Sequence, residues 1–271
     1  MIGRSDLLRR PRGLVVSTSL MRLVPLTALL ALLALVSLLA FAPRLRELAW
    51  KASLALGLVM LASGTWVALS WAPPDQYMGE VQRILYVHVP ILWMGLFALL
   101  LNFLCSVTYL LRASRAADAL AEATAEVGVA FGLVGLGIGA IWGKQTWGVW
   151  WSWDPRMTAT VAMLGVYSLY LVVRAVVREE QARASFSAMV ALVVAVAPPV
   201  VWFSVRWWPS LHQLQSSPKT MDPAMTLALA WNGVAWLGLF VALTWHRYLV
   251  ARTALERLSP TARSGADRAA V

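Results

Sequence analysis

A tryptophan-rich run is the stretch of this chain whose residue types most clearly suit ligand binding. It spans 147–158 and contains Trp147, Gly148, Trp150, Trp151, Trp153, Asp154, Pro155 and Arg156. Tryptophan gathers at membrane–water boundaries, so an aromatic belt is the simplest interpretation. A belt is usually spread over several helix ends, whereas this run is dense. We therefore favour a flat, weakly polar shelf that can stack a large planar ligand, with Asp154 and Arg156 at its rim.

Histidines are the second group of residues that could bind a ligand. His88 lies at the start of an apolar run, His212 lies in the loop before the last apolar run, and His246 follows that last run among basic residues. Two imidazoles can occupy the opposite axial positions of a haem iron. Hydrolytic zinc usually takes three protein ligands and fits less well. The pattern predicts His88 and His212 as haem ligands, with a hydrogen-bonding role for each as the alternative, and a solvated His246.

Three basic side chains near these residues are candidates to pair with haem propionates: Arg83, Lys144 and Arg156. Arginine can bind a carboxylate through two parallel hydrogen bonds. Reaching towards lipid headgroups is the alternative for each of the three. Asp154 is expected to shape its loop, by accepting hydrogen bonds from Arg156 or a tryptophan N–H, rather than to contact the ligand.

The composition is that of an integral membrane protein. The 271 residues are 60% hydrophobic and 13% charged, whereas a soluble domain has about 25% charged residues. The net charge of +10 is scattered over helix ends, so it does not indicate nucleic-acid binding. Cys105 is the only cysteine, which excludes an intrachain disulfide and a cysteine metal cluster. The chain has no nucleotide-binding loop, which argues against an ATPase.

Apolar runs long enough to cross a bilayer, about 20 residues each, define the elements that must position these side chains. They lie near 52–71, 86–111, 122–142, 158–177, 186–205 and 224–245, and a further candidate at 23–43 precedes them. The sequence predicts an all-α polytopic membrane protein with six core transmembrane helices. We divide it into an N-terminal extension (1–51), a haem-handling core (52–245) with a tryptophan-rich loop at 143–158, and a cytoplasmic tail (246–271).

Charge places the loops. Lys and Arg are sparse in the loops 72–85, 143–157 and 206–223 and frequent in the others, so these three loops, with both candidate ligands, are predicted to face outward. The N-terminal segment does not obey this rule, because basic residues both precede and follow 23–43. Three interpretations stay open: an extra helix whose start is translocated, a shallow hairpin, and an over-long start of the reading frame.

Two local patterns predict packing. The pairs Gly128/Gly132 and Gly135/Gly139 allow a neighbouring helix to approach closely. Pro198-Pro199 should kink or break the helix 186–205.

The residues 147–154 resemble the WWD signature of haem-handling proteins in cytochrome c maturation. Within that superfamily, further stretches are similar to the CcmC family of haem exporter and delivery proteins: Ile84–Pro90, Trp142–Lys144, Trp207–Gln213 and Asp222–Met225. The likeness covers roughly 52–245. Pro155 is the departure, because a Trp-Asp-Pro tripeptide is more typical of the CcsA and CcmF haem-lyase branches, whose members are larger or carry more histidines.

The resemblance implies a function. Haem b would be held on the outer face of the cytoplasmic membrane by His88 and His212, with the porphyrin edge against Trp147, Trp150, Trp151 and Trp153. The protein would deliver haem to the chaperone CcmE, with CcmA, CcmB and CcmD as further partners, and would not itself be an enzyme. The alternatives are a haem lyase acting directly on apocytochrome c and a non-haem transporter.

Overall fold

The computed structural model describes residues 18–212 and 221–258 of the chain. In these residues it has no β-strand, and seven segments are helical, long and apolar enough to cross a membrane. The predicted all-α polytopic class is confirmed. The first part of the N-terminal extension, residues 1–17, lies outside the described residues, as do Gln213, Lys219 and the tail beyond 258.

The helices follow one another with short connections. In chain order they are α1 (Thr18–Phe41), η2 (Pro43–Leu45), α2 (Arg46–Trp66), η3 (Val67–Trp71), η4 (Glu80–Ile84), α3 (Leu85–Arg112), α4 (Arg115–Trp147), α5 (Pro155–Val176), α6 (Glu180–Val194), α7 (Ala197–Trp207) and α8 (Pro223–Leu258).

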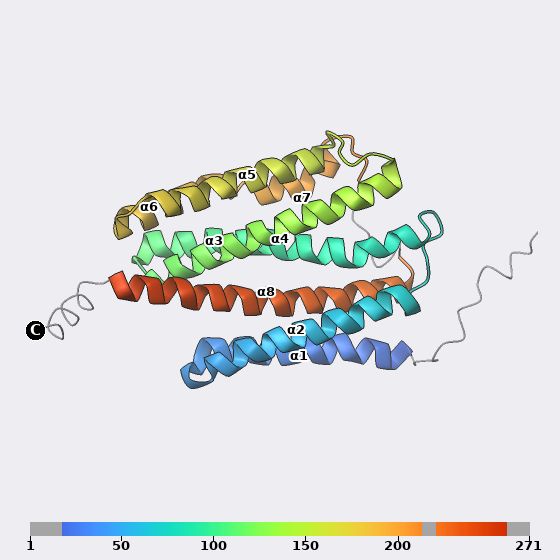
Figure 1. Ribbon diagram of the computed structural model, residues 1–271, viewed down its shortest axis with the longest axis horizontal. Helices are drawn as coiled ribbons and strands as arrows, with labels where there is room; N and C mark the ends of the chain where they lie inside the picture. The colour runs from blue at the N-terminus through green and yellow to red at the C-terminus, as the bar shows by residue number, and fades with distance from the viewer. Residues whose placement is uncertain (1–17, 213–220, 259–271) are drawn as a thin grey trace, which may run out of the picture.

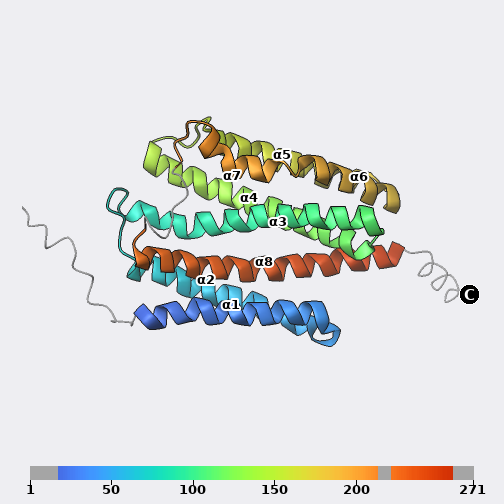
Figure 2. The same ribbon diagram turned by 180° about the vertical axis from the view of Figure 1, so that it is seen from behind.

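All helices run along one axis of the molecule (Figure 1). Helices α3 and α4 lie in the middle, α5 to α7 lie on one side of them, and α8, α2 and α1 lie on the other side, as the view from behind also shows (Figure 2). The loop 148–154, the end of α7 and the start of α8 meet at one end of the bundle, which we call the Trp-rich end. The loops predicted to share a face therefore lie together.

Glycines of α4 let its neighbours approach, as their spacing predicts. A Cβ added at Gly128 would lie 2.9 Å from Leu99 Cδ2 of α3, and one at Gly135 would lie 2.5 Å from Leu92 Cδ2. A Cβ at Gly132 would meet a leucine of α5 at 2.5 Å. Without a shift of these leucine side chains only glycine fits the contacts, so α3, α4 and α5 form a close-packed set.

The predicted break between 186 and 205 is present. Helix α6 ends at Val194, and α7 begins at Ala197 with proline in its first turn. Proline has no N–H to donate and is favoured at a helix start, so the pair Pro198-Pro199 begins a new helix instead of continuing the old one.

Several helix boundaries differ from those predicted from hydropathy. Helices α2, α4 and α6 begin at Arg46, Arg115 and Glu180, six or seven residues before the predicted starts at 52, 122 and 186. Helix α4 continues to Trp147 and ends where Gly148 adopts a left-handed φ of 77°, a conformation that glycine takes without strain. The predicted loop 143–158 is therefore shortened to 148–154. Helix α8 continues to Leu258, beyond the predicted end at 245, because Ala, Arg, Leu and Glu are good helix formers outside the bilayer too.

The N-terminal hydrophobic segment forms α1, a 24-residue helix that lies beside α2 and runs in the opposite direction, with its start at the Trp-rich end (Figure 1). Its length excludes the shallow hairpin. It is long and apolar enough to cross a membrane, as the first interpretation expects, and its start lies at the same end of the bundle as the tryptophan-rich loop.

Candidate functional site

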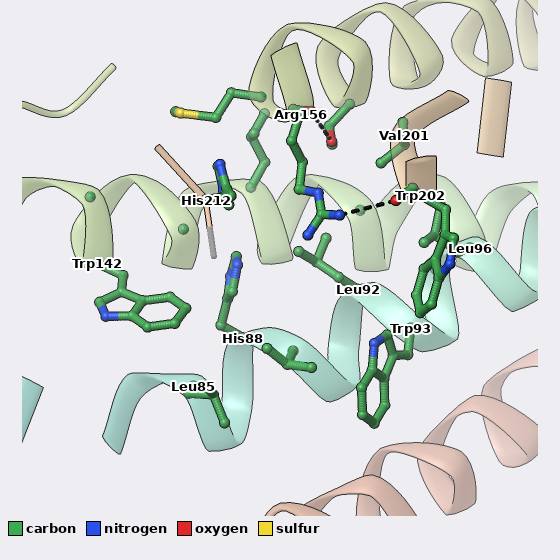
Figure 3. A pocket seen from close by; sticks show the side chains of 18 of the residues that line it. Leu85, His88, Leu92, Trp93, Leu96, Trp142, Arg156, Val201, Trp202 and His212 are labelled. Atoms are coloured by element: carbon green, nitrogen blue, oxygen red, sulfur yellow. Dashed lines mark hydrogen bonds between the residues drawn. The ribbon is translucent and has the colours of Figure 1, made fainter. Parts of the chain in front are cut away.

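A cavity of about 210 Å³ lies among α3, α4, α5 and α7 at the Trp-rich end. Its lining is mainly apolar and aromatic, and it contains both candidate histidines and one arginine, Arg156 (Figure 3). Its deeper part is bordered by the glycines that bring α3 and α4 together, among them Gly95 and Gly132. Glycines therefore account both for the close packing of these helices and for the space that a ligand could occupy.

His88 enters this cavity from the second turn of α3. It is 7% exposed, and its Nδ1 lies 3.0 Å from the backbone carbonyl of Gly135 on α4. A carbonyl only accepts, so Nδ1 carries the proton and donates it. The ring meets Trp142 edge-on, with centroids 5.5 Å apart. Gly139 makes room for the ring, because a Cβ there would lie 2.7 Å from His88 Cε1.

His212 enters from the non-helical segment 208–212 that follows α7. Its Nδ1 donates to Asp154 Oδ1 at 2.8 Å, and its ring meets Trp147 edge-on with centroids 4.9 Å apart. Burial lowers the pKa of His212 below its usual 6.5, and the nearby Asp154 carboxylate only partly opposes that effect. The neutral imidazole with a proton on Nδ1 is therefore the favoured form.

Asp154 links the tryptophan-rich loop to His212. It is 5% exposed and begins α5 by accepting a hydrogen bond from the Arg156 backbone N–H at 3.0 Å. Its carboxylate also accepts from Ser210 Oγ and from the Leu211 backbone N–H, each at 2.7 Å. Burial raises the pKa of Asp154, but these hydrogen bonds and His212 outweigh it, so the net pKa is lowered. Asp154 shapes its loop as expected, and it also binds Ser210, Leu211 and His212, which the sequence did not predict.

The two histidines point towards one another across the cavity (Figure 3), although 124 positions separate them in the sequence. In the part of the chain that the structure describes, each Nδ1 has a hydrogen-bond acceptor and neither Nε2 makes a hydrogen bond. Each ring thus keeps one nitrogen lone pair available to a ligand in the cavity.

The three basic candidates are placed differently. Arg156 lines the cavity and donates from Nη2 to the Trp202 carbonyl at 3.1 Å. Its buried Nε has no hydrogen-bond partner among the described residues. Arg83 instead pairs with Glu80 and donates to carbonyls of the π-helical turn η3 and its end, including that of Ala72 at 3.0 Å.

Lys144 is exposed and donates from Nζ to the Gly148 carbonyl at 2.9 Å, which closes the end of its own helix. Of the three, only Arg156 borders the cavity.

The tryptophans of the signature are divided between the cavity and the surface. Trp147 lines the cavity, whereas Trp150 and Trp153 are 59% and 81% exposed. Trp151 lies edge-on to Trp153, with centroids 5.7 Å apart. Three further tryptophans that the site prediction omitted line the cavity: Trp93, Trp142 and Trp202. Trp142 could have been found, since it belongs to the stretch Trp142–Lys144 that carries the family resemblance.

Comparison with known proteins agrees with the resemblance. The chain matches the model of the CcmC family, described as Heme exporter protein C, over residues 34–262. It is 30% identical over 228 residues to Heme exporter protein C of Escherichia coli K12, covering 82% of this chain and 92% of that protein.

Two further proteins named Heme exporter protein C are similar. That of Bradyrhizobium diazoefficiens is 31% identical over 202 residues, which cover 73% of this chain and 76% of that protein. That of Haemophilus influenzae is 32% identical over 199 residues, covering 71% and 80%. The family match begins inside α1, so it includes residues 34–51 of the predicted N-terminal extension. The chain is therefore a multi-pass membrane protein that belongs to the Heme exporter protein C (CcmC) family.

Proposed function

We propose that this protein binds haem b at the outer face of the cytoplasmic membrane and delivers it to the haem chaperone CcmE during cytochrome c maturation. One observation carries the proposal. His88 and His212 enter a single aromatic cavity from distant parts of the chain, each with Nδ1 held by an acceptor. Metal-ligating histidines usually have this arrangement, in which an acceptor fixes the ring and the other nitrogen binds the metal.

The rest of the cavity lining suits the apolar edge and a carboxylate of a porphyrin. Tryptophan and leucine side chains supply an apolar lining, and two buried donors in it, Arg156 Nε and Trp142 Nε1, have no partner among the described residues. Buried donors without partners are rare in proteins, so they point to a ligand with acceptor groups. We assign the propionate contact to Arg156, because of the three basic candidates only Arg156 lines the cavity, and its buried Nε has no partner among the described residues.

Haem, once bound, would supply the iron and the porphyrin chemistry that ends in covalent attachment to the acceptor protein. This chain would contribute orientation. His88 and His212 would hold the iron, Trp147 would contact the enclosed part of the ring, and Trp150, Trp151 and Trp153 would form the exposed continuation of the proposed shelf beside the cavity. Holding both reactants in register replaces a random collision with a positioned encounter. No catalytic residue is assigned.

Family membership supports the partners and the location that we propose. The relatives are named heme exporter proteins, so we assign this chain to the same export system, with CcmA, CcmB and CcmD as neighbours in the membrane. The scarcity of Lys and Arg in the loops of the Trp-rich end supports an outward orientation of the cavity.

The test is haem ligation in purified protein. His88→Ala and His212→Ala should each lose the low-spin spectrum of bis-imidazole haem, with haem content measured by the pyridine haemochrome assay. His246→Ala is the matched control, because His246 is exposed and packs on Trp50, with ring centroids 5.2 Å apart. Wild-type spectra in both cavity variants would refute ligation. Thioether formation on apocytochrome c by this chain alone would instead favour the lyase alternative.

A further inference from the structure

We propose that Asp154 is a positioning residue for His212, a carboxylate that fixes the loop carrying this ligand to the start of α5. The inference rests on the proposed function, because it concerns how one of the two haem ligands is held.

The carboxylate of Asp154 is saturated with donors from two separate parts of the chain. Oδ1 accepts from His212 Nδ1 at 2.8 Å and from the Arg156 N–H at 3.0 Å. Oδ2 accepts from Ser210 Oγ and from the Leu211 N–H, both at 2.7 Å. The side chain of Asp154 is 1% exposed, so water does not compete for these bonds. Three of the four donors belong to the segment that bears His212.

Ser210 closes the arrangement. Its Oγ donates to Asp154 and accepts from the His212 backbone N–H at 3.0 Å. The ring of His212 is thus bound to the Asp154 carboxylate directly, and its backbone N–H is linked to the same carboxylate through Ser210. The Trp208 N–H still donates to the Ser204 carbonyl at 3.0 Å, but residues 209–212 are not helical. The contacts to Asp154 therefore fix the ring of His212, as helix α3 fixes the position of His88.

A second Asp-Pro pair in the same protein shows what helix capping alone requires. Asp222 precedes Pro223 and begins α8: its Oδ1 accepts from the Ala224 N–H at 2.7 Å, and its carbonyl accepts from the Thr226 N–H at 3.0 Å. Asp154 makes the same two local bonds at α5. Asp222, however, is exposed and bonds to no histidine among the described residues. Burial and the contacts to Ser210, Leu211 and His212 are therefore additional to capping.

A carboxylate that accepts from a ligating imidazole does more than aim it. It makes the other ring nitrogen a stronger electron donor, which favours the oxidised metal and lowers the reduction potential. Asp154 should therefore affect two quantities, the occupancy of the axial position by His212 and the potential of the bound haem.

The test compares Asp154→Asn with Asp222→Asn in full-length protein reconstituted with haem. Asn keeps the shape of Asp but puts an amide N–H₂ where one oxygen accepts two donors. We expect haem affinity to fall about 10- to 100-fold in Asp154→Asn, the low-spin fraction to fall, and the midpoint potential of the remaining low-spin haem to rise. Asp222→Asn should match the wild type in all three.

Added imidazole separates positioning from a general loss of structure. If His212 is only misplaced, free imidazole should restore the low-spin spectrum in Asp154→Asn, as it should in His212→Gly. The inference is overturned if Asp154→Asn keeps the wild-type spectrum and potential while His212→Ala loses ligation, or if imidazole restores His212→Gly but not Asp154→Asn. Wild-type spectra in both histidine variants would instead overturn the proposed function itself.

Discussion

The two histidines of the cavity are held by different kinds of structure. His88 stands on α3, and its ring is fixed by a backbone carbonyl and by the space that Gly139 leaves on α4. His212 stands on a non-helical segment and is fixed by the side chain of Asp154. A backbone carbonyl cannot be removed by a side-chain substitution, so the site of His88 is disturbed mainly by steric change, whereas the contact of His212 can be lost by changing one polar group. We therefore predict that haem ligation by His88 is sensitive to steric substitutions and that ligation by His212 is sensitive to polar substitutions.

The largest effect is expected from Gly139→Ala. The new methyl group would lie 2.7 Å from His88 Cε1, so the ring must leave its position and most of the low-spin haem spectrum should be lost. Gly137→Ala is the matched control, since a Cβ there meets nothing within 4 Å. Both changes add about 0.5–1 kcal/mol of intrinsic helix stability, so a difference between them in haem spectra isolates the steric contact. Equal spectra in the two variants would show that His88 is not sterically fixed.

An intermediate effect is expected from Arg156→Gln. Hydrogen bonds to charged groups contribute about 1.5–3 kcal/mol, so haem affinity should fall roughly tenfold or more. Lys144→Gln, which removes an exposed charge outside the cavity, should change it less than about twofold.

Titration with haem dimethyl ester, which has no free propionates, sharpens this prediction. Wild type and Arg156→Gln should then bind equally. A persistent difference would mean that Arg156 acts through its bond to the Trp202 carbonyl instead.

The smallest effect on ligation is expected from Trp150→Ala and Trp153→Ala. Both side chains lie outside the cavity lining and are more than half exposed, so little contact with an enclosed ring is lost. Haem affinity and the low-spin spectrum should stay within a few-fold of wild type, whereas Trp147→Ala should weaken binding more. A loss in Trp153→Ala as large as that in Trp147→Ala would mean that the bound ring extends over the exposed shelf.

Hydropathy and proline positions were sufficient to predict the helical class and the break between α6 and α7, because bilayer thickness and missing N–H groups act locally. The glycine pairs of α4 were correctly interpreted because their regular spacing is visible in the sequence and a position without a side chain lets a neighbouring helix approach. The ends of α4 and α8 were not predicted, since hydropathy marks the apolar part of a helix and both helices continue beyond that part. The basic residues could not be ranked from the sequence, because burial and partners in the fold distinguish them. Arg83 pairs with Glu80, Lys144 is exposed, and only Arg156 lines the cavity.

The contact between Asp154 and His212 was beyond sequence reasoning for a different reason. It depends on how far α7 carries the chain before the segment 208–212 turns back over the start of α5. A single sequence has no local pattern for such a contact. For the two histidines, the loop charges predicted only that both lie on the same side of the membrane, and not that they are close together.

The protonated Nδ1 atoms have a thermodynamic consequence. Metal capture by imidazole normally releases a proton when the ring must first be neutralised. Here the acceptors at Gly135 and Asp154 hold both rings with the proton on Nδ1, and burial favours the uncharged state of His212. In the proposed haem site, ligation by neutral rings would release no proton, so haem binding should depend little on pH above the lowered pKa of His212.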